Sequence, residues 1–348
     1  MNTTVEEATG RMLDILNDGA IALLTGLGYQ TGLFDTLAKL PAARSELIAD
    51  AAGLSERYVR EWLGGMVTAG LLRYDPDGGT YLLREEYRPV LSGQGPENLA
   101  PTIQYLPLLA QAVPKIERAF RNGGGTGYGD YPGFHQLMAA NSAVVNDAAL
   151  LEAIIPLSGR TESLRTGISV ADIGCGEGHA LNLLAGAYPA SDFTGYDFSA
   201  EALEAATAEA ERRGLANVHF ELLDVADLED TERFDFITAF DAIHDQADPA
   251  RVLRNIRAAL RPGGTFLMVD INASSRLEDN SAIPWGSFLY AISTFHCMAV
   301  SLGQGGAGLG AVWGRQLALS MLREAGFGDV VVHELEDDPF NAYYVARQ

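Results

Sequence analysis

A glycine-rich turn follows a short apolar run near the middle of the chain. The run spans residues 169–173 and continues through Gly174-Cys175-Gly176-Glu177-Gly178 into a helical pattern at 179–187. Glycines permit positive backbone angles and let the main chain approach a ligand without interference from a Cβ atom. The spacing is G-x-G-x-G, whereas a dinucleotide fingerprint needs a third glycine where His179 stands. The pattern predicts a strand, a turn against an adenosyl group and a helix, with the ligand at Asp172, Gly174, Cys175, Gly176 and Gly178.

Acidic residues also follow the next three predicted strands. The strand at 192–196 ends at Asp197-Phe198, where a carboxylate can accept hydrogen bonds from both hydroxyls of a ribose. The strands at 218–222 and 234–239 lead to Asp224-Val225 and Phe240-Asp241. Any one of these acids alone could be a solvated turn residue. Because the landmarks occur in register, we interpret them as parts of one site.

The run from Asp172 to Gly178 resembles motif I of class I methyltransferases that use S-adenosylmethionine (SAM). Later landmarks agree in order and separation, including Arg261-Pro262-Gly263-Gly264 before a strand at 265–270. The resemblance covers about residues 169–348 and implies an α/β fold with a Rossmann-like seven-stranded sheet, closed by antiparallel strands at 330–335 and 342–347. It also implies SAM as cofactor and S-adenosylhomocysteine (SAH) as product. The implied contacts are Asp197 and Phe198 at the ribose, Asp224 and Val225 at the adenine, and Phe240 and Asp241 near the methionine part.

The charge balance fits a cationic cofactor better than a phosphorylated one. The chain carries 46 acidic and 24 basic residues, a formal net charge of -22. This field repels nucleic acid backbones and anionic membranes, so we expect neither as a partner. The first 18 residues lack the cationic and apolar segments of a signal peptide, and no window approaches the ~20 apolar residues of a membrane helix. We expect a cytoplasmic protein.

The stretch from Ala242 to Asp248 is similar to the His-Asp-Trp-x-Asp stretch of plant and polyketide O-methyltransferases. In those enzymes the histidine takes a proton from a hydroxyl oxygen, a role that suits the imidazole pKa of ~6.5. The resemblance makes His244 the catalytic candidate and oxygen the favoured acceptor, with nitrogen, carbon and sulfur left open. Gln246 replaces the tryptophan of that pattern. The alternative is a structural or cofactor-packing role for His244.

The acceptor is expected to bind an insertion at 272–314, over the carboxyl ends of the strands. The insertion is rich in aromatic residues and has a glycine tract at 303–310 that resembles a mobile lid. A second glycine-dense loop, at 122–129, is interpreted either as a connector between domains or as a flap with Tyr131 beside the site. His296 is a second possible base. The predicted substrate contacts are Tyr128, Trp285, Phe288, His296 and Trp313.

Metal chemistry is not expected. The methyl group of a sulfonium is already activated, so alignment and exclusion of water can supply catalysis. Cys175 and Cys297 are too few for a disulfide framework or a thiolate cage, and no histidine and carboxylate set has ligand spacing. A magnesium-dependent mechanism is therefore disfavoured.

The N-terminal part has the order of a winged helix. Helical patterns at 19–40, 46–52 and 56–69 precede a hairpin at 71–74 and 80–83. Gly32-Leu33-Phe34-Asp35 resembles the opening helices of small-molecule O-methyltransferases, which implies homodimer packing. Glu56, Arg57, Arg60 and Glu61 cancel on the second helix, and Asp75 and Asp77 lie in the hairpin turn, where phosphate contact needs Lys or Arg. We expect a dimerisation and substrate-lid module rather than a DNA reader.

The whole chain resembles actinobacterial winged-helix methyltransferases. The expected domains are a winged-helix and dimerisation domain at 1–95, a helical linker at 96–155 and a methyltransferase domain at 156–348. The leading hypothesis is metal-independent methyl transfer from SAM to a small molecule, with secondary metabolites among the candidates. The alternatives are a SAM-binding regulator that uses the winged helix on DNA, and a SAM-binding enzyme that performs other chemistry in the same pocket.

Overall fold

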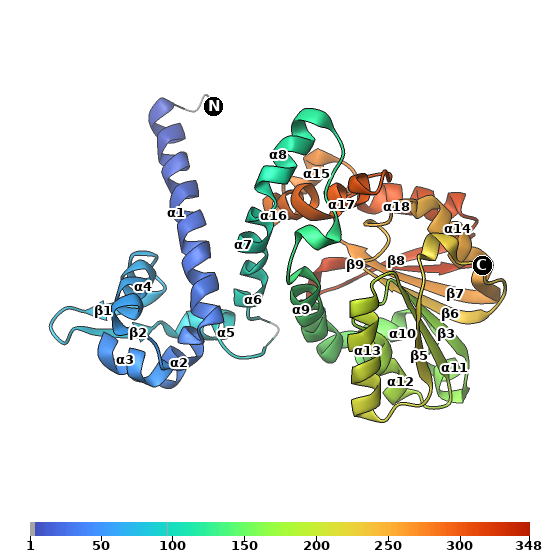
Figure 1. Cartoon of the computed structure of the whole chain (residues 1–348), viewed down its shortest axis with the longest axis horizontal. Helices are drawn as coiled ribbons and strands as arrows, with labels where there is room; N and C mark the ends of the chain where they lie inside the picture. The colour runs from blue at the N-terminus through green and yellow to red at the C-terminus, as the bar shows by residue number, and fades with distance from the viewer. Residues whose placement is uncertain (1–3, 96) are drawn as a thin grey trace. The chain divides into compact units, whose positions relative to one another are not determined.

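A computed structural model describes residues 4–95 and 97–348 (Figure 1). The chain forms two compact units, Met1–Ala110 and Gln111–Gln348. This division differs from the expected boundaries at residues 95 and 155. The segment predicted as a linker is shared between the units, and its helices after residue 110 pack with other helices of the second unit.

The first unit has the predicted winged-helix order. Its elements are α1 Val5–Gln30, α2 Leu33–Lys39, α3 Ser45–Ala52, α4 Glu56–Thr68, β1 Leu72–Asp75, β2 Thr80–Leu83, η1 Glu85–Tyr87, α5 Arg88–Leu91, α6 Ala100–Ile103 and α7 Tyr105–Ala110. The first helix begins much earlier than the predicted residue 19, because Thr4 and Glu7 form a capping box. Ser45 is the first residue of α3 and donates to Glu56 Oε1 at 2.7 Å.

Close contact between α1 and the winged helix depends on one glycine. A Cβ atom at Gly28 would lie 2.4 Å from the Trp62 ring and 2.7 Å from the Phe34 ring. The Trp62 indole donates to the Leu24 carbonyl oxygen at 2.7 Å. These rings belong to a core with Leu63 and Met66, both 0% exposed. The contact fixes the C-terminal half of α1 on α4.

The second unit is built on a seven-stranded sheet of order β5-β4-β3-β6-β7-β9-β8. Its strands are β3 Ser169–Ile173, β4 Asp192–Asp197, β5 Val218–Leu222, β6 Phe234–Phe240, β7 Leu260–Ile271, β8 Asp329–Leu335 and β9 Asp338–Arg347. The strands from β5 to β7 are parallel, and β9 runs antiparallel to both β7 and β8. This confirms the predicted Rossmann-like methyltransferase sheet with its antiparallel closing strands.

Helices cover both faces of this sheet. They are α8 Val113–Asn122, η2 Tyr128–Asp130, α9 Phe134–Ala149, the π-helical turn η3 Leu150–Ile154, α10 Ile155–Leu157, α11 Thr161–Thr166, α12 His179–Ala187, α13 Ala200–Arg213, η4 Val225–Asp227 and α14 Pro249–Ala259. The insertion contributes α15 Leu277–Asn280, α16 Gly286–Ile292, the π-helical turn η5 Ser293–Cys297 and α17 Met298–Gly303, and α18 Gly314–Glu324 follows it.

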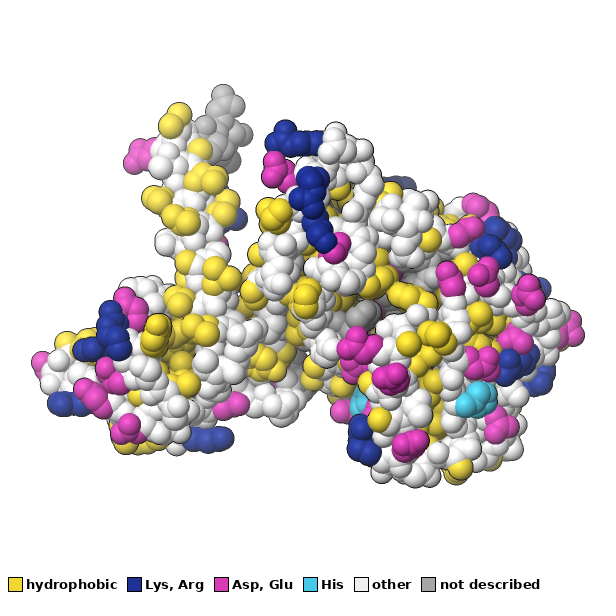
Figure 2. Space-filling model, in the orientation of Figure 1, with side chains coloured by type: hydrophobic (Ala, Val, Ile, Leu, Met, Phe, Trp, Pro, Cys, Tyr) yellow, Lys and Arg dark blue, Asp and Glu magenta, His cyan; other side chains and the backbone are white. Residues whose placement is uncertain are grey.

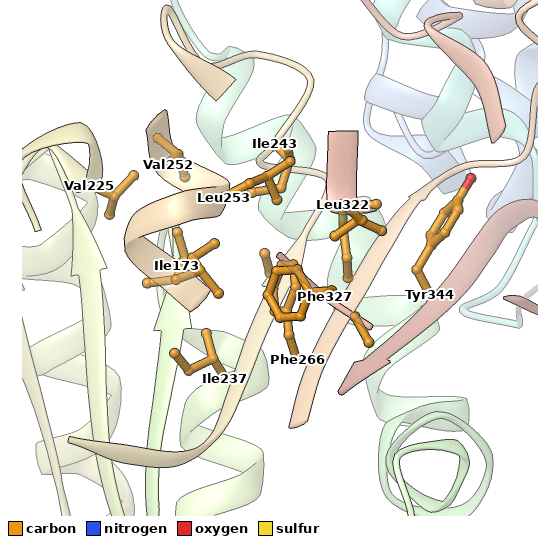
Figure 3. Close-up of a cluster of buried hydrophobic side chains, with 14 of the residues drawn as sticks. Ile173, Val225, Ile237, Ile243, Val252, Leu253, Phe266, Leu322, Phe327 and Tyr344 are labelled. Atoms are coloured by element: carbon orange, nitrogen blue, oxygen red, sulfur yellow. The ribbon is translucent and has the colours of Figure 1, made fainter. Parts of the chain in front are cut away.

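Alternation along the strands divides the core into two layers. Val170 and Phe236 face α12 and η3, whereas Ile173 and Ile237 face α14 and α18 (Figure 3). Successive side chains of a strand point to opposite faces, so a parallel sheet covered on both sides needs apolar residues throughout. The carboxyl ends of the strands are left to polar and glycine residues, and the site lies there.

One helical stretch in the described chain, Gln136–Leu157, is long and apolar enough to cross a membrane by length and composition. Asp147 and Glu152 interrupt this stretch, so it is not a run of consecutive apolar residues. Its Leu150, Ile154 and Ile155 are buried in the core of the second unit. The last part of this stretch therefore packs in the core of that unit.

Candidate active site

The glycine turn after β3 takes the conformation that its sequence predicted. Gly174, Gly176 and Gly178 have φ angles of 69°, 53° and 70°. The amides of Gly174 and Cys175 both donate to the Tyr196 carbonyl oxygen, at 2.8 and 3.0 Å. A Cβ at Gly174 would lie 2.6 Å from that of Ala242, so glycine is required there for packing as well as for the backbone angle.

Asp197 fastens this turn to the end of β4. Its Oδ2 accepts from the Gly176 amide at 2.9 Å, and its Oδ1 accepts from the Ser199 amide at 2.8 Å. Each carboxylate oxygen keeps further acceptor capacity. A Cβ at Gly176 would meet no atom within 4 Å, so the main chain is open to a ligand at this point.

A cavity at the carboxyl ends of β3, β4 and β6 brings most of the predicted site together. Predicted residues in its lining are Tyr128, Asp172, Gly174, Cys175, Gly176, Gly178, Asp197, Phe198, Phe240, Asp241 and His296. Residues in its lining that we did not predict include Phe134, Met138, Ala139, Ser142, Asn146, Glu177, Asp245 and Gln246. No lysine or arginine lines this cavity among the described residues.

Helix α9 supplies the wall that sequence reasoning missed. Phe134, Met138, Ser142 and Asn146 recur at intervals of four residues and therefore lie on one side of the helix. That stripe was readable in the sequence, but it mixes apolar and polar residues, so it does not resemble an ordinary core face. The wall completes the cavity opposite the glycine turn.

Six predicted residues do not line this cavity. Asp224 caps η4 by accepting from the Ala226 amide at 2.9 Å, and Val225 is buried in the core. Trp285 packs against Phe340 with ring centroids 4.5 Å apart. Residues predicted for the site but absent from the lining are Asp224, Val225, His244, Trp285, Phe288 and Trp313.

The prediction that Trp313 contacts a substrate needs correction. Its side chain is buried in the core, and its indole donates to Asp270 Oδ1 at 3.0 Å. An indole N–H that is buried usually finds such a partner. Among the aromatic residues predicted from the insertion, only His296 reaches the cavity.

His244 lies behind the cavity wall, between two carboxylates. Its Nδ1 is 2.9 Å from Asp270 Oδ1, and its Nε2 is 3.2 Å from Asp245 Oδ1. Burial by itself would lower the pKa of His244, but Asp270 and Asp245 outweigh it and raise the pKa well above 6.5. The imidazole therefore holds its proton at neutral pH, which opposes the predicted role as a base and favours the structural alternative.

Two groups of possible ligand atoms share His244, contrary to the expectation that histidines and carboxylates are not clustered. One group is Asp241, His244 and Asp270, and the other is His244, Asp245 and Cys297, each with ligand atoms within 4.8 Å of one another. The sequence hid these groups because β7 and the insertion are distant from residue 244. A proton on His244 already supplies positive charge among these acids.

Asp172 and Asp241 are acids whose pKa values are raised to about 7. For Asp172 the main cause is burial, opposed by a hydrogen bond from Thr238 Oγ1 at 2.7 Å. For Asp241 burial and the nearby Asp270 raise the pKa. Asp241 also has a φ of 50°, and its Oδ1 is buried without a hydrogen-bond partner in the described chain. Such left-handed non-glycine residues are concentrated at functional sites.

His296 lies among aromatic rings at the other side of the cavity. It stacks on Phe134 with ring centroids 3.5 Å apart, and the edges of Tyr128 and Tyr131 approach it at 5.7 and 4.8 Å. The π-helical turn η5 carries His296 toward the cavity and Cys297 toward His244. Such turns are frequent at functional sites because they re-aim side chains.

Both glycine-rich loops of the second unit are fastened. The loop at 122–129 lies inside this unit and not between the two units, and its Thr126 amide donates to the Ala299 carbonyl oxygen at 2.9 Å. In the tract at 303–310, the Ala307 amide donates to the Ala247 carbonyl oxygen at 2.9 Å. The connector interpretation is therefore wrong, whereas Tyr128 does line the cavity, as the flap interpretation required.

The strand order, the glycine turn and the acidic cavity together define the SAM-dependent methyltransferase class. Residues 164–326 match the family model of a methyltransferase domain, and residues 19–92 match that of the Rv2258c-like winged HTH domain. The chain therefore carries a SAM-dependent methyltransferase domain preceded by a winged-helix domain.

Similar proteins agree with this class. The ubiquinone biosynthesis O-methyltransferase of Coxiella burnetii is 35% identical over 107 residues, which are 30% of this chain and 44% of that relative. Human N-acetylserotonin methyltransferase in complex with SAM has a TM-score of 0.70 and 19% identity, covering 100% of this chain and 99% of its own. The mitomycin 7-O-methyltransferase MmcR has a TM-score of 0.71 and 18% identity, covering 98% of each chain. The chain thus spans less than half of the length of that curated relative. The two solved structures have the same fold as this chain.

Proposed function

We propose that this protein binds SAM and transfers its methyl group to a small-molecule acceptor. The observation that carries the proposal is the glycine turn, tied to Asp197, in a cavity that is lined by five acids and, among the residues that the structure describes, by no lysine or arginine. A sulfonium cation without phosphates suits such a lining, whereas a dinucleotide does not. The open main chain at Gly176 fits an adenosyl group, and Asp241 Oδ1, which has no hydrogen-bond partner among the described residues, fits an ammonium group.

The residues present would act by binding and alignment. When bound, SAM supplies a methyl group that is already activated for displacement. Asp197 would hold the ribose hydroxyls, and Asp241 would accept from the methionine ammonium. Tyr128, Phe134 and His296 would exclude water and orient the acceptor. The O-methyltransferases among the similar proteins favour a hydroxyl oxygen as the acceptor atom. An amine nitrogen is the alternative, because it suits the acidic cavity.

Between the two histidines, His296 is better placed to take a proton from the acceptor. It lines the cavity, whereas His244 lies behind Asp245 and already carries its proton. A base must reach the proton that it removes. We therefore assign the base role to His296 and a fixed positive charge to His244.

The test of the proposed function is SAM binding by Asp197→Asn. This variant keeps the shape of the side chain and removes its charge, so we expect SAM affinity to fall by about tenfold or more, as for a lost charged hydrogen bond. Asp192→Asn, at the exposed beginning of the same strand, is the matched control. Calorimetry that detects no heat with SAM or SAH, or equal affinities for both variants, would sink the proposal.

The first unit is better suited to pairing with a second copy than to reading DNA. Hydrophobic side chains follow α1 along its exposed length (Figure 2). Those at positions 5, 12, 16, 23 and 27 (Val5, Met12, Leu16, Leu23 and Leu27) are each 47% exposed or more. Their spacing alternates between seven and four residues, which is the seam of a helix that packs on another helix. On α4, Arg57 pairs with Glu61 and Arg60 with Glu56. We propose a cytoplasmic homodimer of secondary metabolism and expect no salt-sensitive binding of duplex DNA.

A further inference from the structure

Two acids of the group around His244, Asp241 and Asp245, line the cavity. Asp270 and Asp245 are the two acids closest to its ring nitrogens, and the imidazolium supplies a single positive charge to this pair. The Asp270 side chain is 0% exposed and also accepts from the Trp313 indole, so it cannot meet a ligand. The Asp245 side chain is 16% exposed and lines the cavity. Because Asp241 is assigned to the methionine ammonium, Asp245 is the acid of this group that remains for the acceptor.

Asp245 lies near Tyr128 and the turn η5. It acts electrostatically on Tyr128, and one of its oxygens lies within 4.8 Å of the Cys297 sulfur. Cys297 follows His296 on the turn η5, so Asp245 and the aromatic group around His296 border the same space. Asp245 Oδ1 is buried and lies 3.2 Å from His244 Nε2, so this oxygen faces His244.

The lining excludes one class of acceptor. A carboxylate or phosphate on the acceptor would meet Asp245 and the aromatic rings and would find no lysine or arginine in the described lining. A buried anion without a partner is costly, and like charges add to that cost. An ammonium group, in contrast, would be paired by Asp245 and attracted to the faces of Phe134 and Tyr128.

We propose that the acceptor is a ring-bearing molecule that carries an amine, with its ammonium on Asp245 and its ring against Phe134 and His296. This inference rests on the proposed function because it takes the other half of the cavity to be occupied by SAM. It leaves the methylated atom open between a hydroxyl oxygen of this molecule and its amine nitrogen. Acceptors that are acidic near the reacting atom are excluded.

The experiment measures the affinities of three ligands, similar in shape and different in charge, for the full chain saturated with SAH. The probes are 2-phenylethylamine, 2-phenylethanol and 3-phenylpropanoate, followed by ligand-observed NMR titration. We expect the amine to bind about tenfold or more tightly than the acid, and the alcohol to bind with intermediate affinity. The amine gains one charged hydrogen bond, whereas the carboxylate of the acid is repelled by Asp245. Equal or tighter binding of the acid, or no binding of any probe at millimolar concentration, would overturn the proposal.

Two variants separate Asp245 from the general acidity of the molecule. Asp245→Asn is expected to weaken amine binding about tenfold and to change alcohol binding and SAH affinity less than about twofold. Glu211→Gln removes an exposed charge from α13 and should change none of the three. If Asp245→Asn leaves the preference for amine over alcohol intact, the assignment of Asp245 is wrong. Loss of SAH binding in the parent protein would instead refute the proposed function, and the two failures are thus distinguishable.

Discussion

At the scale of single residues, His244 shows how burial changes the meaning of a motif. A histidine in a His-Asp sequence suggests a base, but two carboxylates hold this imidazole in its charged form. Removing one member of a buried charged group leaves the others uncompensated and costs about 3–5 kcal/mol. The role of His244 can thus be read from folding stability as well as from activity.

We predict that His244→Gln lowers the free energy of unfolding most strongly in acidic and neutral solution. Because the folded pKa of His244 is raised, its stabilisation is fully present below its unfolded pKa of ~6.5 and is lost as pH rises through the folded value. The difference in unfolding free energy between the parent and the variant should therefore shrink in alkaline solution, measured by urea unfolding at a series of pH values. His219→Gln, at an exposed histidine, is the control. A difference that is constant with pH would contradict this role.

The two acids with a pKa of about 7 predict a pH dependence of cofactor binding. Asp172 and Asp241 gain negative charge as pH rises from 6 to 8, so SAM affinity should rise by about three- to tenfold. SAH lacks the sulfonium charge and should respond less. The free energy of unfolding changes with pH in the opposite direction. A carboxyl group whose pKa is raised in the folded protein stabilises the fold at acidic pH, and this stabilisation is lost as pH rises from the unfolded pKa of 3.8 to about 7. Calorimetry with both ligands checks this, and identical pH profiles for SAM and SAH would refute it.

At the scale of elements, the loop at 122–129 and helix α17 interlock through backbone atoms. A Cβ at Gly125 would lie 1.9 Å from the Ala299 carbonyl oxygen, and a Cβ at Gly303 would lie 2.0 Å from that of Thr126. Tyr131 donates to the Phe295 carbonyl oxygen beside the same contact. This contact holds Tyr128 and His296 in the cavity wall without contributing a ligand contact of its own.

We predict that Gly125→Ala destabilises the second unit by about 1–3 kcal/mol, as for overpacking against a rigid neighbour. Gly127→Ala is the matched control, because a Cβ there meets no atom within 4 Å and its φ of −114° suits any residue. Thermal unfolding of the two variants measures the effect. Equal melting temperatures would show that the loop and α17 are not in close contact.

At the scale of the whole molecule, the exposed side of α1 predicts assembly. Leu16→Glu combined with Leu23→Glu should convert a homodimer into a monomer, because two charges per chain would be buried without partners at the seam. Asp14→Lys lies on the opposite side of the helix and should leave the mass unchanged. Light scattering after gel filtration measures the mass. A parent chain that is monomeric at micromolar concentration would refute the assembly.

The sequence by itself determined the α/β class, the glycine turn and the residues after each parallel strand, because these depend on local patterns. Motif spacing alone places Asp172, Asp197 and Asp241 at one sheet edge. Local sequence patterns could not show that α9 forms a wall of the cavity or that Asp245 rather than His244 reaches the cavity. They also could not show that the Trp313 indole donates to the buried Asp270. Only the tertiary structure decided these points, since burial and charge pairing depend on residues separated by tens of positions. His244 and Asp270 are the clearest case, because their ion pair forms only when β7 brings Asp270 next to His244.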